Sequence, residues 1–167
     1  MAFDAYLQID GVPGESTDSA HVGWIEIQSF VNGVAQTFTG SFSSSGAPAS
    51  GKANFNTFSV TKQVDKSSPL LYKKCCTGEP IGKISLDICR ATGNSTPYLN
   101  FLLNNSVVAS VQTAGANAGA TADDVPTEIV TFAFGKITET YTPTDAKTGK
   151  PGGVIVGGWD RNANQSV

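Results

Sequence analysis

The sequence predicts a mainly β fold, a small antiparallel β-barrel with one short α-helix and extended loops. Many short segments alternate apolar and polar residues, which is the period of a strand with one buried face. Only residues 68–78 carry both helix-start and helix-stop signals. Three flexible loops separate the other segments. The length of 167 residues suits one core, so residues 1–167 are expected to form a single domain.

The first two strands are predicted from their alternation. In residues 3–9 every second side chain is apolar, and residues 11–14 then supply a turn. A second strand from His21 carries Ile25 and Ile27 on one face, but the next large apolar residue, Phe30, has the opposite parity. A β-bulge near Gln28 and Ser29 would restore the pattern and bend the strand as barrel closure requires.

An extended loop and a third strand precede the helix. Residues 39–54 are rich in Gly, Ser and Ala and are expected to be ordered only by a neighbouring molecule. Residues 55–64 follow as a strand with Phe58, Val60 and Val64 on one face.

The helix is predicted from its ends. Ser68 is the expected N-cap, Pro69 suits the first turn, and Gly78 can adopt the left-handed conformation that ends a helix. A helix this short requires packing, so the side with Leu70 and Leu71 is expected to plug one end of the barrel.

The second half of the chain alternates in the same way. Residues 84–89 are predicted to form a strand with Ile84, Leu86 and Ile88 inward. Residues 93–95 form a turn, and residues 98–112 form either a strand pair or one long bent strand. A low-complexity loop occupies residues 113–124.

The last strands follow Pro126. Val130, Phe132 and Phe134 share a face, Gly135 breaks the parity, and Ile137 and Tyr141 resume it, which is typical of a bulged barrel strand. Residues 142–153 form a polar loop before a final strand at residues 154–159.

Composition excludes several classes of function. The net charge is −3 and no basic cluster exceeds a Lys-Lys pair, so the sequence predicts no nucleic-acid binding. Charged residues make up only 15%, which indicates either much surface in contact with other protein or a surface rich in Gly, Ser, Thr and Asn. No signal peptide or membrane-length apolar run is found, so assembly in the cytoplasm without membrane insertion is expected.

The residues that could carry chemistry give weak signals. Residues 46–53 match a phosphate-binding loop except at the eighth position, where Ala53 replaces Ser or Thr, and they open no helix. His21 is the only histidine, and Asp18 and Glu15 are placed to hydrogen-bond it at a turn, which favours a structural role. We therefore expect no catalytic residues, no cofactor and no enzyme.

Cysteines and carboxylates give no convincing metal site. Cys75 and Cys76 are adjacent on the helix and point about 100° apart, so they are interpreted as core or near-core thiols in a reducing compartment. Asp123, Asp124 and Asp160 lack the alternating spacing of a calcium loop and are interpreted as solvated carboxylates.

Two other classes of function remain open. A carbohydrate-binding β-module would use Trp24 or Trp159 as an exposed stacking face, which sugar quenching of fluorescence would reveal. A hydrolase built on His21 would lose turnover in the His21→Ala variant, whereas a structural His21 would lose only stability or assembly.

Five ordered stretches together resemble the Hcp family, the tube protein of bacterial type VI secretion systems. They are Gly14-Glu15-Ser16, Asp18, His21, Ile25-Glu26-Ile27 and Ser29-Phe30; Val60-Thr61-Lys62, Asp65 to Leu70, Cys75 and Gly78; Val107 and Ser110-Val111; Glu128, Phe132, Phe134, Ile137 and Tyr141; and Gly158-Trp159. The Cys-Cys pair and the Ala/Gly-rich stretch after Thr113 are less typical of the family.

The resemblance implies a tight β-barrel whose six copies form a ring, with rings that stack into a tube inside a contractile sheath. Baseplate and spike proteins are the implied partners, effector proteins travel in the lumen, and the tube is secreted from the bacterium without a signal peptide. A phage-type tail-tube protein of a related contractile machine shares this architecture.

Two groups of residues are expected to serve such an assembly. By residue type, the contact between rings is placed in residues 39–54, with the candidates Ser43, Ser44, Ser45, Gly46, Ser50 and Lys52. By resemblance, the lumen wall is placed at Gln28, Ser29 and Val31.

Overall fold

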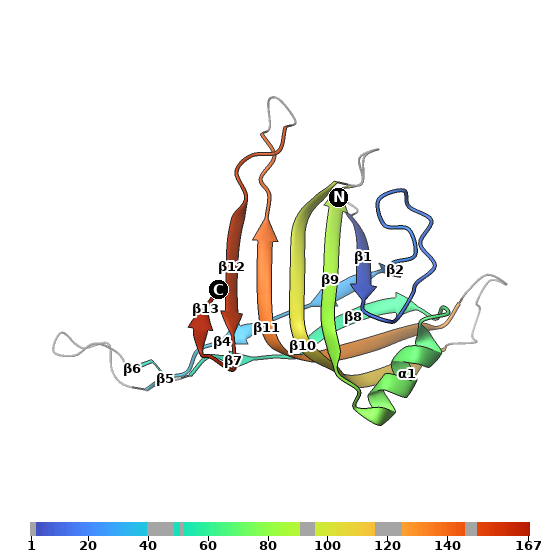
Figure 1. Ribbon diagram of the computed structural model, residues 1–167, viewed down its shortest axis with the longest axis horizontal. Helices are drawn as coiled ribbons and strands as arrows, with labels where there is room; N and C mark the ends of the chain where they lie inside the picture. The colour runs from blue at the N-terminus through green and yellow to red at the C-terminus, as the bar shows by residue number, and fades with distance from the viewer. Residues whose placement is uncertain (1–2, 40–48, 51, 91–95, 116–124, 146–149) are drawn as a thin grey trace.

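The computed structural model describes residues 3–39, 49–50, 52–90, 96–115, 125–145 and 150–167. The fold is mainly antiparallel β with one α-helix, as predicted (Figure 1). Its elements are β1 Phe3–Ile9, β2 Ile25–Ile27, β3 Ser29–Val31, β4 Val34–Ala35, β5 Phe38–Thr39, β6 Ala49–Ser50, β7 Asn54–Phe55, β8 Phe58–Gln63, α1 Ser68–Thr77, β9 Ile81–Arg90, β10 Pro97–Ala114, β11 Thr127–Tyr141, β12 Ile155–Asp160 and β13 Gln165–Ser166.

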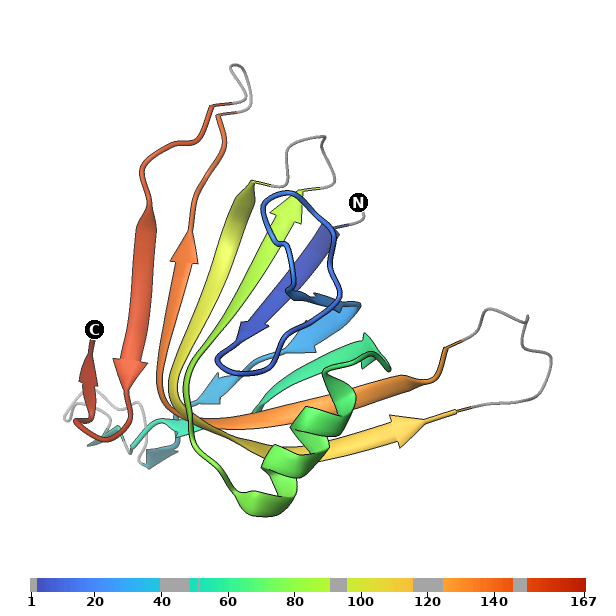
Figure 2. The same ribbon diagram turned by 45° about the vertical axis from the view of Figure 1, so that its right-hand side comes forward.

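The long strands β10 and β11 connect two sheets. They pair antiparallel along their whole length and bend sharply together (Figure 2). The bend contains Asn105, whose φ is +52°, and a register shift between Val108 and Ser110. Residues 98–112 therefore lie in one long bent strand, which is the second of the two predicted alternatives.

Each long strand contributes to both sheets. The large sheet has the order β12-β11-β10-β9-β1-β2, with the short strand β13 at the edge of β12. The small sheet consists of β3, β8, residues 127–132 of β11 and residues 108–114 of β10. The two sheets diverge from the bend and enclose the core between them (Figure 2).

The chain crosses from the large sheet to the small sheet at Gln28. Ile27 pairs with Ala5 of β1, Ser29 pairs with Thr61 of β8, and the Gln28 amide donates to the Thr61 carbonyl at 2.8 Å. The expected change of parity lies here, because Ile27 is buried and Phe30 packs on the same core. The sheets thus form a barrel-like enclosure whose ladder is interrupted at this crossing.

The inner faces of both sheets form one core. Phe58 meets Phe101 with ring centroids 5.4 Å apart, and Phe30 lies 5.5 Å from Phe101. Two residues expected inside, Val64 and Tyr141, are instead partly exposed, because they lie at strand ends beyond the core. Cys89 alternates with the inward residues of β9 and is nevertheless buried, because the contact of His21 with Asp87 holds the segment at residues 11–24 on that side of β9.

The helix differs from its prediction at the start. Ser67, not Ser68, is the N-cap, and it makes no side-chain capping bond. Gly78 ends the helix at φ +65°, and its amide donates to the Lys74 carbonyl at 3.0 Å, as predicted. Of the two leucines, Leu71 is buried whereas Leu70 is 38% exposed, because consecutive helical residues point about 100° apart.

A buried ion pair in the small sheet anchors the first turn of the helix through Ser68. The Lys62 ammonium on β8 donates to Glu128 Oε1 on β11 at 2.7 Å, and neither side chain is more than 1% exposed. Lys62 also donates to Asp65 Oδ1 at 2.8 Å, and the Ser68 hydroxyl donates to Glu128 Oε1 at 2.7 Å. The hydroxyl expected to cap the helix is therefore used to anchor its first turn.

The described residues 32–39, 49–50 and 52–57, which carry β4 to β7, form an arm that projects from the body (Figure 1). Residues 39–54 were expected to be a loop, but the described parts of the arm pair in two short ladders, β4 with β7 and β5 with β6. At the base of the arm, the Arg161 guanidinium lies over the Phe55 and Phe134 rings at 5.5 and 5.3 Å and donates to the Phe134 carbonyl. These contacts attach the arm to the bend of β11.

No helix in the described part of the chain has the length and apolar character needed to span a membrane.

We expect the Lys62→Met variant to lose about 3–5 kcal/mol of unfolding free energy, because Glu128 would remain buried without its cation. The double variant Lys62→Met/Glu128→Leu should recover most of this loss, since neither charge is then left unpaired. Urea denaturation at neutral pH measures both. A double variant as unstable as the single one would contradict the assigned pairing.

Candidate functional site

The outer face of the small sheet carries no charged side chain among its described residues. Pairing across the strands places its residues in three rows. The rows are Ser29, Thr61, Ile129 and Gln112; Val31, Ser59, Thr131 and Ser110; and Gln63, Thr127 and Ala114. Their side chains alternate with the buried positions Phe58, Val60 and Lys62 and are exposed or half-buried. We call this set of three rows the neutral face.

Two of the three predicted lumen residues lie on the neutral face. Ser29 and Val31 are exposed, and Val31 is 65% accessible. Gln28 is also exposed but sits at the crossing between the sheets, before the first row begins. The sequence did not single out Thr61, Ile129 or Gln112, which the register brings into the same row as Ser29.

The small sheet has two free edges among the described strands. β3 pairs only with β8, and β9 pairs with β10 only as far as Ser106. Residues 108–114 of β10 therefore pair with β11 alone. α1 packs on the inner side of this segment, where Val111 and Thr113 line a shallow pocket with Ser68 and Tyr72. The sheet consequently presents unpaired backbone groups along two opposite edges.

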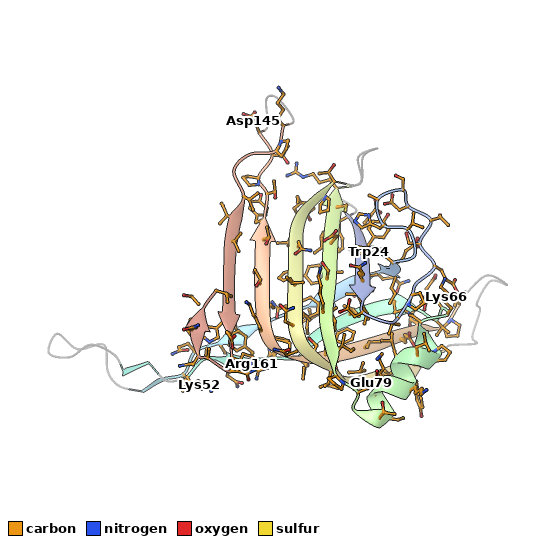
Figure 3. All side chains as sticks on the ribbon, in the orientation of Figure 1. Trp24, Lys52, Lys66, Glu79, Asp145 and Arg161 are labelled. Carbon is orange, nitrogen blue, oxygen red and sulfur yellow. The ribbon has the colours of Figure 1, made fainter. Side chains whose placement is uncertain are left out.

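The residues predicted for ring stacking are only partly described. Ser43, Ser44, Ser45 and Gly46 lie outside the described residues, and Ser50 pairs in β6 with Phe38. Lys52 is exposed near Arg161 at the base of the arm, on the side of the molecule away from Lys66 (Figure 3). An open groove of about 660 Å³ separates the arm from β12 and contains Lys52, Glu139 and Trp159 on its walls.

His21 is a buried structural residue. Its Nδ1 lies 2.8 Å from Asp18 Oδ1 and its Nε2 lies 3.1 Å from Asp87 Oδ2. The ring stacks on Tyr6 at 4.3 Å and meets Trp24 edge-on. Both ring nitrogens are engaged by carboxylates, so this geometry offers no base to an attacking nucleophile.

The surroundings of His21 confirm one expected partner and correct the other. Asp18 bonds to it, but Glu15 instead accepts from the Lys66 amide at 3.0 Å. Gly14 is required in the same segment, because a Cβ there would lie 2.2 Å from the Trp24 carbonyl oxygen. His21 thus holds the segment at residues 11–24 onto β1 and β9.

The tryptophans do not form one stacking platform. Trp24 precedes β2 and packs against His21, whereas Trp159 lies on β12 at the other end of the large sheet. Both are half-buried.

The described residues contain no cluster of three or more metal-ligating side chains. Asp160 accepts from the amides of Asn162 and Ala163 and so stabilises the turn after β12, while Asp123 and Asp124 lie outside the described residues. Cys75 is half-buried, but Cys76 is exposed, which corrects its expected place near the core. Burial, followed by the Asp87 and Asp18 carboxylates, raises the pKa of Cys89 to about 12.

Two free edges on the described part of the small sheet define a class of β subunit whose sheet further strands can extend. Comparison with known proteins narrows this class. The family model described as "Type VI secretion system effector, Hcp" matches residues 6–141. Protein hcp1 of Pseudomonas aeruginosa is 34% identical over 165 residues, which cover 98% of each chain. The chain belongs to the Hcp family of the type VI secretion system.

Solved structures agree with this assignment. A structure described as a type six secretion system protein has a TM-score of 0.91 and 34% identity, covering 99% of this chain and 100% of that one. Hcp1 from Salmonella typhimurium has a TM-score of 0.77 and 26% identity over 99% of this chain and 100% of its own. A type VI secretion system effector from Yersinia pestis has a TM-score of 0.72 and 27% identity, with 94% and 99% covered.

The three thiols should react at different rates. At pH 8 a thiol with a pKa of about 12 is ionised in roughly one molecule in ten thousand, so Cys89 should stay unmodified until the protein unfolds, whereas exposed Cys76 reacts first. Titration with a disulfide reagent, with and without denaturant, measures this. The Cys76→Ser variant should lack the fast phase; rapid labelling of Cys89 in the folded protein would contradict its burial.

The raised pKa of Cys89 also makes the unfolding free energy depend on pH in the alkaline range. The unfolded thiol loses its proton near pH 9.0 but the folded one only at about 12, so the unfolding free energy should fall between these values as pH rises. Its slope from this group is at most about 1.4 kcal/mol per pH unit. The raised pKa of Tyr6, caused by burial and then Asp18, acts in the same direction. The Cys89→Ala variant should show a shallower decline.

Proposed function

We propose that the chain is the tube subunit of a type VI secretion system. Hexameric rings of this subunit stack into a tube inside the contractile sheath, contact baseplate and spike proteins, and carry effectors in the lumen. The tube is assembled in the cytoplasm and leaves the bacterium with its cargo, and the subunit itself catalyses no reaction. The observation that carries the proposal is the pair of free edges on opposite sides of the small sheet.

The two edges differ, so they join copies head to tail. Pairing β3 of one subunit with residues 108–114 of β10 in the next satisfies backbone groups that would otherwise stay exposed at an edge. A head-to-tail contact between identical chains gives a ring when its rotation closes. The small sheets would then form one continuous wall around the hole.

The shape of the subunit supports the assignment of the neutral face to the wall of the hole. The large sheet and α1 lie on the inner, core-facing side of the small sheet, whereas the described chain leaves the neutral face uncovered (Figure 2). A ring has less room at small radius than at large radius. The bulk of each subunit therefore lies outside, and the neutral face with Ser29 and Val31 faces the lumen.

The arm is proposed to contact the next ring. Its described part projects beyond the body of the subunit, and its base is attached to the body by the contact of Arg161 with Phe55. Lys52 and Ser50 lie within it. The candidates Ser43, Ser44, Ser45 and Gly46 stand in the sequence between β5 and β6, outside the described residues.

Size-exclusion chromatography with light scattering should give six times the subunit mass, and negative-stain images of the same peak should show annular particles.

Two proline variants, Gln112→Pro and Thr113→Pro, test the free edge of β10. The backbone amides of consecutive strand residues point to opposite sides of the strand. One of the two variants therefore removes an amide that is bonded to β11, and the other removes an amide on the free edge.

The free-edge proline variant should keep its unfolding midpoint but lose the ring. The other variant serves as its matched control, because it should mainly lose stability. A wild-type protein that stays monomeric at high concentration, or rings that persist in both variants, would contradict the proposal.

Deleting Ser43 to Ser50 should leave hexameric rings that no longer stack, because the candidate stacking residues in this stretch are removed while the base of the arm at Phe55 is kept. Electron microscopy of concentrated rings, or of sheathed tubes in cells, measures stacking. The ring mass of the variant is the control for folding. Tubes of normal length from the deletion variant would contradict the proposal that the arm joins successive rings.

A further inference from the structure

We infer that the neutral face retains cargo through uncharged contacts, and that it fits a protein surface made of hydroxyl, amide and small apolar side chains. This inference rests on the proposed function, because it needs the neutral face to line a closed lumen. Its consequence is that retention depends little on salt and is weakened by charge on the cargo.

The first observation is the separation of charge across the small sheet. Its strands do carry charges, but Lys62 and Glu128 point inward and neutralise each other at 2.7 Å. Strand alternation then leaves only Ser, Thr, Gln, Val, Ile and Ala on the outer rows. Two of the rows extend over four strands and the third over three, so the uncharged surface is continuous within one subunit.

The second observation is the chemistry of the rows. Hydroxyl groups can donate or accept, and those of Ser110 and Thr131 already bond to each other at 2.7 Å. Two apolar side chains stand among them, Val31 at 65% exposure and Ile129 at 44%. Such a surface can form hydrogen bonds with both donor and acceptor groups of a partner, and it can bury small apolar groups.

Charge complementarity identifies the partner. A charged cargo group pressed against this wall would lose water without gaining a counter-ion, which is unfavourable, whereas an uncharged polar group exchanges one hydrogen bond for another. Nucleic acid fits poorly for the same reason, because its binding depends on cations placed along the phosphates. The face therefore favours uncharged protein surface.

The test uses assembled rings and three fluorescent peptides of equal length. One contains Ser, Thr, Gln and Val only; in the others alternate residues are replaced by Glu or by Lys. Ring mass is confirmed before peptide is added, so failure of the proposed function is seen separately. Fluorescence anisotropy at about 50 mM and about 500 mM salt should show salt-independent binding of the uncharged peptide, and about tenfold weaker binding of both charged ones.

Variants then place the binding on the neutral face. Rings of Thr61→Lys should bind the uncharged peptide about tenfold more weakly and should bind the Glu peptide in a salt-dependent manner. Gln112→Lys lies in the same row and serves where Thr61→Lys forms no rings. Val22→Lys is the matched control, since Val22 is 70% exposed on the segment that covers β1 and should change nothing. Preference of wild-type rings for a charged peptide, binding that salt abolishes, or no binding of the uncharged peptide would overturn the inference.

Discussion

The shared bend of β10 and β11 is the constraint on which the rest of the structure depends. Because both strands turn together, each contributes to two sheets, and the core fills the angle between them. Asn105 adopts a positive φ at the bend, and a Cβ on the neighbouring Gly135 would lie 3.2 Å from the Asn105 side chain. The bend also sends residues 108–114 beyond the end of β9, which creates the free edge used in the proposed ring. Local backbone geometry thus produces both the enclosure and the free edge at residues 108–114 of β10.

Much of the fold could be predicted because period-two alternation is a local signal. It predicted β1, the central part of β9 and the change of parity around Gln28, since each depends on residues that are close in sequence. It was less successful where distant segments decide burial. Lys62 occupies an inward position of β8, although a lysine considered alone would be expected on the surface. Only the pairing with Glu128, 66 residues later, makes its burial possible. Ser68 was misplaced for the same reason, because its hydroxyl donates to Glu128 instead of capping the helix.

The neutral face likewise combines residues that could be suggested from the sequence with residues whose position depends on distant strands. Ser29 and Val31 were suggested by resemblance, but their rows include Thr61, Ile129 and Gln112, whose positions follow from register between strands far apart in sequence. No local pattern contains that register. The buried pair and the neutral face are two results of one alternation, because the positions that place Lys62 and Glu128 inside leave uncharged side chains outside. A subunit with 15% charged residues can therefore be well packed and still have an extended uncharged wall.

A density map of the assembled particle by electron cryo-microscopy tests the central claim most directly, because it shows which edges meet and which face lines the hole. The account predicts that β3 of each subunit lies antiparallel or parallel beside residues 108–114 of β10 in its neighbour, within hydrogen-bonding distance, with Ser29, Thr61, Ile129 and Gln112 facing the lumen. A ring whose subunits meet through other strands, or whose neutral face points outward, would contradict it.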